Sequence, residues 1–242
     1  MASTIGEGTG DDVAVTGLAY GARIMPVRVL DSLGEGDSVA ISAGIRWAAR
    51  NGADVINLSF EFGTQVRSSE IPDILAALRY ASRKGALTVG ASGNGAAQSL
   101  AYPARATQVL SVGATTEHGC VAEYSNNGAN LDIVAPGGGE DATIAGDPSC
   151  RPLDESGRNI FQMTFDGSVR RFGLHSEMGT SMAAPHVSAA AALVIASGVI
   201  GPNPSATEVE DRLKATARDL GLGGPDSRYG AGLLDAARAV TP

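Results

Sequence analysis

The chain has 242 residues, with 18 Lys+Arg against 26 Asp+Glu, a formal net charge of -8 and 43% hydrophobic residues. This composition excludes a disordered chain and predicts one soluble globular domain over residues 1–242. Nucleic acid and anionic membrane surfaces are disfavoured as partners, because both attract basic clusters and no Lys/Arg run here exceeds two residues.

β-Branched runs alternate with alanine-rich helical stretches, which is the pattern of strand, helix, strand crossovers around a parallel sheet. The predicted fold class is therefore α/β. The first half of the chain predicts, in order, a strand over Ala22–Leu30, a helix over Ser38–Asn51, a strand over Asp54–Phe60, a helix over Ile71–Lys84 and strands over Ala86–Ala91, Val109–Ala114 and Leu131–Ala135. Gly52 and Gly85 follow the two helices as typical C-terminal stops.

Residues 137–179 form a long irregular segment, which we interpret as an insertion that contains a hairpin of residues 161–165 and 169–172. Helices are predicted over Ser181–Ala196, Thr207–Ala217 and Leu234–Val240. The first of these helices lies in a stretch without charged residues. Its apolar run is shorter than the roughly 20 residues that span a bilayer, so a buried core helix is predicted and no membrane partner.

The two cysteines, Cys120 and Cys150, are 30 residues apart and lack the close Cys/His spacing of a zinc site. Either they form one disulfide or they are two unrelated thiols, and the sequence leaves both open. Residues 1–10 lack the basic stretch and apolar run of a secretory signal, so no signal peptide is predicted on this chain.

A serine between small residues opens the long apolar helix, in the segment GTSMAAPHV at 179–187. A hydroxyl at a helix N-terminus lies beside unpaired backbone N–H groups and the positive end of the helix dipole, which together stabilise an oxyanion. Two interpretations stay open. Ser181 is a nucleophile, or it is the N-cap of the helix, a position at which serine is favoured.

The nonapeptide resembles the nucleophile motif of the subtilisin-like serine proteases, the subtilases. Three more segments resemble that family in the same chain order: DVINLSF at 54–60 resembles the groove strand, ASGN at 91–94 the oxyanion-hole segment, and YPA at 102–104 the following turn. The resemblance implies a three-layer subtilisin-like fold and serine hydrolase activity. It makes Ser181 the nucleophile, and the Asn94 amide and the Ser181 N–H the oxyanion hole. It also implies a cis Tyr102-Pro103 bond.

By the same resemblance, the substrate groove would be lined by Ser59, Phe60, Glu61, Ala91, Ser92, Gly93 and Thr180. Phe60, Glu61 and Phe62 are bulkier than the glycine-rich groove edge that is usual in the family. This departure weakens the expectation of ordinary peptide binding, because an extended substrate pairs with an unobstructed backbone edge.

In the family, the catalytic Asp and His precede the nucleophile in the chain. The opening residues 2–5 resemble the helix that follows the catalytic His, so we expect both residues upstream of Met1 and a truncated catalytic domain. Of the histidines present, His186 is predicted to be structural because it lies within the nucleophile helix, and His118 to be a surface turn residue. His175 is a candidate surrogate base.

Without its general base, subtilisin loses about 2 × 10⁶ in kcat, and its binding groups and oxyanion hole still leave about 10³–10⁴ over water. We therefore predict weak esterase or peptidase activity. Two alternatives remain: an inactive fragment that binds extended peptide, and one part of a protease that an upstream segment completes.

The absent strand would leave an exposed sheet edge, which is costly. We expect either a rearranged sheet, with the Ala22–Leu30 strand shifted, or a homodimer that shares strands. The family also implies calcium, with Asp141, Asp147 and Asp154 in a suitable irregular segment, and secretion.

Overall fold

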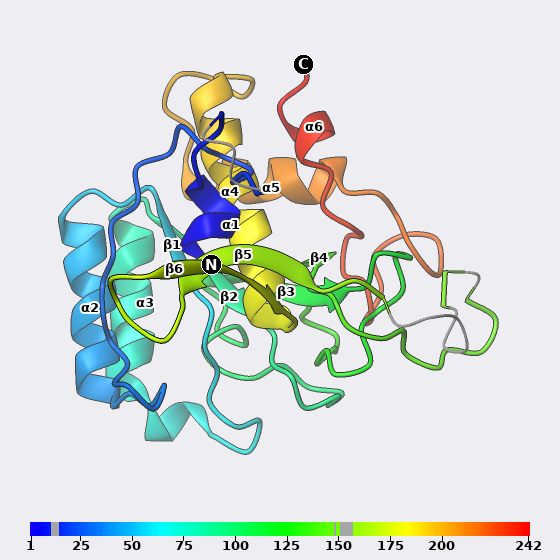
Figure 1. The fold of residues 1–242 in the computed structure, drawn as a ribbon, viewed down its shortest axis with the longest axis horizontal. Helices are drawn as coiled ribbons and strands as arrows, with labels where there is room; N and C mark the ends of the chain where they lie inside the picture. Colours follow the sequence, from blue (N-terminus) through cyan, green and yellow to red (C-terminus); the bar gives the residue numbers. More distant parts are fainter. Residues whose placement is uncertain (11–14, 148, 151–156) are drawn as a thin grey trace.

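The computed structural model describes residues 1–10, 15–147, 149–150 and 157–242. Its main sheet has four parallel strands in the order β1-β2-β3-β4 (Figure 1). Their bounds are Val55–Leu58, Leu87–Ala91, Val109–Thr115 and Ile133–Pro136. All residues of β2 and β3 are buried, as in a parallel sheet covered on both faces. The α/β fold class is confirmed.

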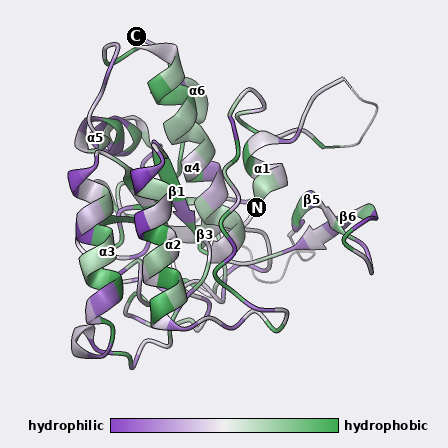
Figure 2. Ribbon diagram, turned by 90° about the vertical axis from the view of Figure 1, so that its left-hand side faces the viewer, coloured by the Kyte–Doolittle hydropathy of each residue, from purple (hydrophilic) through white to green (hydrophobic). Residues whose placement is uncertain are grey.

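Helices α2 (Ser38–Arg50) and α3 (Pro72–Arg83) form one layer, and α4 (Thr180–Ser197) packs against all four strands from the other side (Figures 1 and 2). Next to α4 lie α5 (Ala206–Thr216), which also contacts β2, and α6 (Ala236–Ala239). The remaining helices are α1 (Ala2–Gly6) and the 3-10 helix η1 (Ser68–Glu70). The predicted helices of the chain are thus confirmed to within one residue at each end, except the last, which is shorter.

Helix α4 is long and apolar enough to cross a membrane by length and composition alone, and 61% of it is buried inside the protein. Small side chains such as Ala183 and Ala190 are fully buried there, next to Val187 and Val194. They bring the helix backbone close to the sheet, whose Leu110 and Ile133 side chains belong to the same buried cluster. The prediction of a buried core helix is confirmed.

The predicted strand over Ala22–Leu30 is wrong. This segment is not in a strand of either sheet. It packs instead on α2, where a Cβ on Gly44 would lie only 2.4 Å from Cγ1 of Val29. A cleft of about 1210 Å³ separates the segment from the edge of β1, and α4 lines its floor.

The expected rearrangement of the sheet is also wrong, because β1 remains an edge strand in the part of the chain that the structure describes. The segment that should have moved to cover β1 lies across the cleft from it.

Strands β5 (Ile160–Phe165) and β6 (Phe172–Glu177) form the predicted antiparallel hairpin, which stands out from the body on the side of α1 (Figure 2). Its second strand begins at Phe172 rather than at 169, because the chain turns over 166–171, with Asp166 N–H donating to Arg171 O and the two side chains paired. The hairpin shares contacts with α1.

Cys120 and Cys150 form a disulfide with a Cα–Cα distance of 4.8 Å, which settles the alternative that the sequence left open. The Tyr102-Pro103 bond is cis, as the resemblance implied.

Candidate active site

Ser181 is the second residue of α4, and Gly179 is the N-cap residue. Gly179 has φ 145°, a backbone conformation that a residue with a Cβ rarely adopts. The Ser181 hydroxyl donates to the carbonyl of Ser59 at 3.1 Å rather than accepting from a helix N–H. The N-cap interpretation of Ser181 is therefore wrong.

Ser59 directly follows β1 and forms a second hydrogen bond with Ser181, in which Ser59 is the donor. Its hydroxyl donates to the Ser181 carbonyl at 2.9 Å and accepts from Asn57 Nδ2 at 2.9 Å. These reciprocal bonds place the half-buried Ser181 at the carboxyl end of the parallel strands. Open α/β sheets bind their ligands at this end.

Asn94 lies in the loop after β2, against the residue that precedes Ser181. Its Oδ1 accepts from the Thr180 backbone N–H at 2.8 Å and from the Thr180 hydroxyl at 3.0 Å. Because a backbone N–H can only donate, the atom facing it must be the amide oxygen, and Nδ2 is turned away from α4. Within the described chain, the Ser181 N–H has no acceptor. The Ser181 N–H at the helix start and Nδ2 of Asn94 in the adjacent loop are thus the two candidate donors for an oxyanion.

Gly93 holds this loop close to its neighbours. Its N–H donates to the Thr180 hydroxyl at 3.2 Å, and its φ is 113°. A Cβ there would lie 2.1 Å from Asn126 Nδ2 and 2.3 Å from Glu61 Oε2. Only glycine lets the three segments meet at this point.

Thr180→Val is expected to destabilise the fold by about 1–3 kcal/mol, because the isosteric side chain leaves the buried Gly93 N–H without its acceptor. It also removes one of the two bonds that orient the Asn94 amide. Urea unfolding measures the loss, and Thr180→Ser, which keeps the hydroxyl, is the matched control. Equal stability of the Val and Ser variants would contradict this role of the hydroxyl.

Two positioning residues were missed in the sequence. Buried Asn126 accepts from the N–H groups of Gly95 and Ala97 at 3.0 and 2.9 Å, and so shapes the Asn94 loop. The Tyr124 hydroxyl accepts from the Gly179 N–H at 3.0 Å, and burial raises its pKa, which keeps it protonated. Their only sequence signal is a polar turn after β3, which many surface loops share.

Glu61 is the one bulky groove residue that reaches Asn94. Its Oε1 accepts from the Asn94 backbone N–H at 3.0 Å and from Nδ2 at 3.2 Å. Phe60 and Phe62 instead pack edge to face at 6.2 Å, against the core between α2 and α3. The predicted bulk at the groove edge is thus concentrated in a single carboxylate.

The other expected groove residues divide into two groups. Ser59, Gly93 and Thr180 contact Ser181 or Asn94 as described above. The side chains of Ala91 and Ser92 are buried at 1% and 0% exposure, and the Ser92 hydroxyl donates to Asn126 O at 2.9 Å. Their side chains therefore face the interior and not a groove.

None of the three histidines bonds to the Ser181 hydroxyl in the part of the chain that the structure describes. The His186 Nδ1 lies 2.9 Å from Met182 O, and burial lowers its pKa, in agreement with a structural role. His118 lies in a turn, as predicted, with its side chain 23% exposed, and its Nδ1 lies 3.0 Å from Asp141 Oδ2. His175 pairs with Gln162 across the hairpin, and its ring lies beside Gly173.

The described residues contain no group of three His, Cys, Asp or Glu that could hold a metal ion, and calcium binding stays a prediction. Asp141 accepts from the Thr116 hydroxyl and contacts His118. Asp147 accepts from the Tyr229 hydroxyl at 2.6 Å. Asp154 lies outside the described residues.

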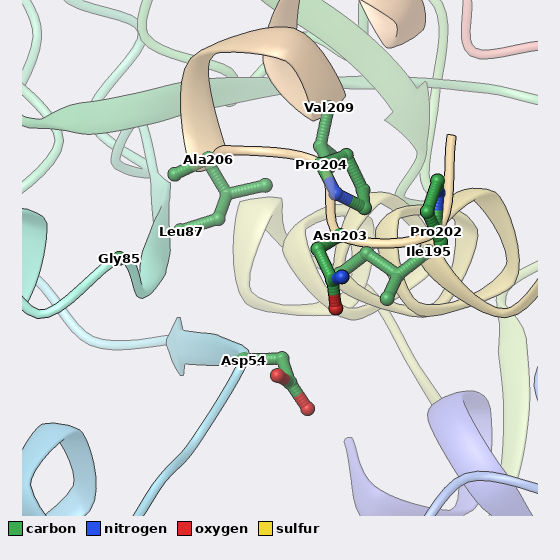
Figure 3. Close-up of a pocket in the computed structure, with 9 residues that line it drawn as sticks. All are labelled: Asp54, Gly85, Leu87, Ile195, Pro202, Asn203, Pro204, Ala206 and Val209. Carbon is green, nitrogen blue, oxygen red and sulfur yellow. The ribbon is translucent and has the colours of Figure 1, made fainter. Parts of the chain in front are cut away.

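A small cavity of about 160 Å³ lies at the opposite end of the sheet (Figure 3). It is bordered by Asp54 and Leu87 at the amino ends of β1 and β2, and by Ile195 near the end of α4. It contains one carboxylate and neither a nucleophile nor an oxyanion donor pair. The candidate nucleophile Ser181 lies at the other, carboxyl end of the sheet.

A model of the Subtilase family matches residues 1–232. Subtilisin Savinase of Lederbergia lenta is 36% identical over 230 residues, which cover 95% of this chain and 72% of that protein. An alkaline protease of Alkalihalobacillus alcalophilus is also 36% identical over 230 residues, which cover 95% of this chain and 51% of that protein. A solved protease of Pseudoalteromonas arctica PAMC 21717 matches with a TM-score of 0.80 at 31% identity, over 99% of this chain and 68% of that one. The chain belongs to the subtilase family of serine peptidases.

Proposed function

We propose that the chain is a serine hydrolase in which Ser181 Oγ attacks a peptide or ester carbonyl. The observation that carries this proposal is the orientation of the Asn94 amide, whose Oδ1 is held by Thr180 beside the unpaired Ser181 N–H. Attack forms an Oγ–C bond and moves negative charge onto the carbonyl oxygen. Preorganised N–H donors stabilise that charge in the transition state.

Among the residues that the structure describes, the proposed reaction lacks a strong base that could accept the proton of the Ser181 hydroxyl. Within the described chain its one acceptor is the Ser59 carbonyl, which is not a base of useful strength. Solvent must then take the proton, and hydrolysis is slow without a positioned general base. Activated esters have a better leaving group than peptides. We therefore propose weak esterase activity that exceeds peptidase activity.

Labelling with a fluorophosphonate tests the nucleophile directly. Ser181 Oγ forms a bond to phosphorus and fluoride leaves, and peptide mass spectrometry locates the adduct. We expect an adduct on Ser181, its absence in Ser181→Ala, and normal labelling in Ser197→Ala, which removes an exposed hydroxyl at the far end of α4. Absence of any adduct on Ser181 would favour the inactive peptide-binding fragment.

The same assay tests the surrogate base that the sequence suggested. If His175 assists Ser181, His175→Ala labels more slowly at neutral pH. Labelling at the wild-type rate rejects that role, because removal of a working general base lowers the rate steeply.

One observation favours a second candidate function, a protease part that a further segment completes. The cleft beside β1 is bounded by an edge strand on one side and by residues 21–30 on the other, and it ends at Ser59, next to Ser181. A strand added there would bring its carboxyl end to the nucleophile. The gene sequence upstream of Met1 tests this candidate: a segment that carries an Asp and a His in family order supports it, and a stop codon directly upstream rejects it.

We propose that the protein works outside the cell, on peptide or ester substrates. The Cys120–Cys150 disulfide supports this location, because such bonds persist in oxidising compartments. A homodimer that covers the edge of β1 is part of the proposal, and sedimentation analysis distinguishes it from a monomer.

A further inference from the structure

The Glu61 carboxylate accepts from Asn94 Nδ2, one of the two donors that the proposed oxyanion needs. Both the backbone N–H and Nδ2 of Asn94 point at Oε1, at 3.0 and 3.2 Å. Glu61 is exposed, and in the described chain it has no ion pair with Lys or Arg. An uncompensated negative charge therefore lies where negative charge has to develop in the reaction, and the two charges repel each other.

The position of the Glu61 carboxylate is fixed by its neighbours in the structure. Oε2 lies over Gly93, where a Cβ would come within 2.3 Å of it, so the absence of a side chain at 93 creates the space. The neighbours Phe60 and Phe62 pack into the core and hold the Glu61 backbone at the site. Glu61 thus extends across the carboxyl ends of β1 and β2.

We propose that Glu61 selects substrates that carry a Lys or Arg side chain on the residue whose carbonyl is attacked. This inference rests on the proposed function. Asn94 Nδ2 carries two hydrogens, so an oxygen bound to the second one would lie about 5 Å from Glu61 Oε1. A cation at Glu61 is therefore carried by the residue that supplies the carbonyl.

Pairing with such a cation changes the site in two ways. It draws the carboxylate away from the Asn94 amide, which frees Nδ2 for the oxyanion, and it cancels the repulsion. A neutral side chain does neither. The net charge of -8 on the whole chain adds a long-range attraction for cationic peptides.

Equilibrium binding tests the selection without any catalysis. The protein is Ser181→Ala, and the ligands are acetyl-Ala-Ala-Lys-amide and its norleucine analogue, titrated by NMR. We expect the lysine peptide to bind about fivefold more tightly, as for a partly exposed ion pair. Adding Glu61→Gln should reduce this ratio to below twofold. Asp211→Asn, which removes one charge from α5, should leave it unchanged, and higher salt should lower it.

A kinetic comparison completes the test, with p-nitrophenyl esters of acetyl-lysine and acetyl-norleucine. We expect Glu61→Gln to slow hydrolysis of the lysine ester and to speed up that of the norleucine ester. An equal increase on both esters, with no binding preference, would show that Glu61 merely blocks the amide, and would overturn the proposal. Failure of both esters counts against Ser181 as a nucleophile, while the binding ratio still decides the role of Glu61.

Discussion

Asn94→Ala is expected to lower kcat for p-nitrophenyl ester hydrolysis by about 10²–10³, the loss found for the oxyanion-hole asparagine of subtilisin, or about 2.7–4 kcal/mol of transition-state stabilisation. The amide is held by Thr180 with Nδ2 outward, so the Asn94 side chain itself is already oriented before it donates to the oxyanion. KM should change little, because the bond strengthens only as negative charge develops. Steady-state kinetics measures both parameters.

Asn94→Asp separates the catalytic contribution from the structural one. Aspartate keeps an oxygen for the Thr180 N–H but cannot donate to an oxyanion, and its charge adds to that of Glu61. We expect a loss in kcat at least as large as in Asn94→Ala, with the Thr180 contact preserved. A change of less than about threefold in both variants would contradict the assignment of Asn94 to the oxyanion hole.

Replacing both Cys120 and Cys150 with alanine is expected to lower the free energy of unfolding by about 3–4 kcal/mol. The disulfide closes a loop with a sequence separation of 30 and so restricts the unfolded chain. Alanine is chosen because Cys120 is fully buried, and a serine hydroxyl there would need a partner. Urea unfolding of the two proteins measures the difference.

Wild-type protein unfolded in the presence of a thiol reductant is the matched control for the disulfide. Its stability should approach that of the double variant, because both lack the crosslink in the unfolded state. A loss below about 1 kcal/mol would show that the unfolded chain gains little freedom when the bond is removed.

Local sequence patterns were sufficient for most secondary structure. The amphipathic repeat of α2 and the continuous apolar runs of β2 and β3 are periodicities within one element, and each element followed them. The placement of Ser181 at the start of α4 was equally readable, because the nonapeptide is contiguous and the small residues after it require a buried helix.

The segment Ala22–Leu30 is a case in which the local sequence pattern predicted the wrong structure. Its alternating β-branched residues are those of a strand, but a strand also needs a hydrogen-bonded partner, and here a cleft separates it from β1. Propensity describes one chain segment, whereas pairing depends on a second segment far away in the sequence.

The finer chemistry of the site depended on the same kind of distant contact. Glu61 meets Asn94 across 33 residues, and Thr180 meets it across 86. The partner of His118 is 23 residues away and the two cysteines are 30 apart. Nothing in a local window specifies these distances, because they arise only when parallel strands bring their carboxyl ends together. The residues proposed to react could thus be named from the sequence and its resemblance to the family, while the residues that orient or oppose them were determined by packing.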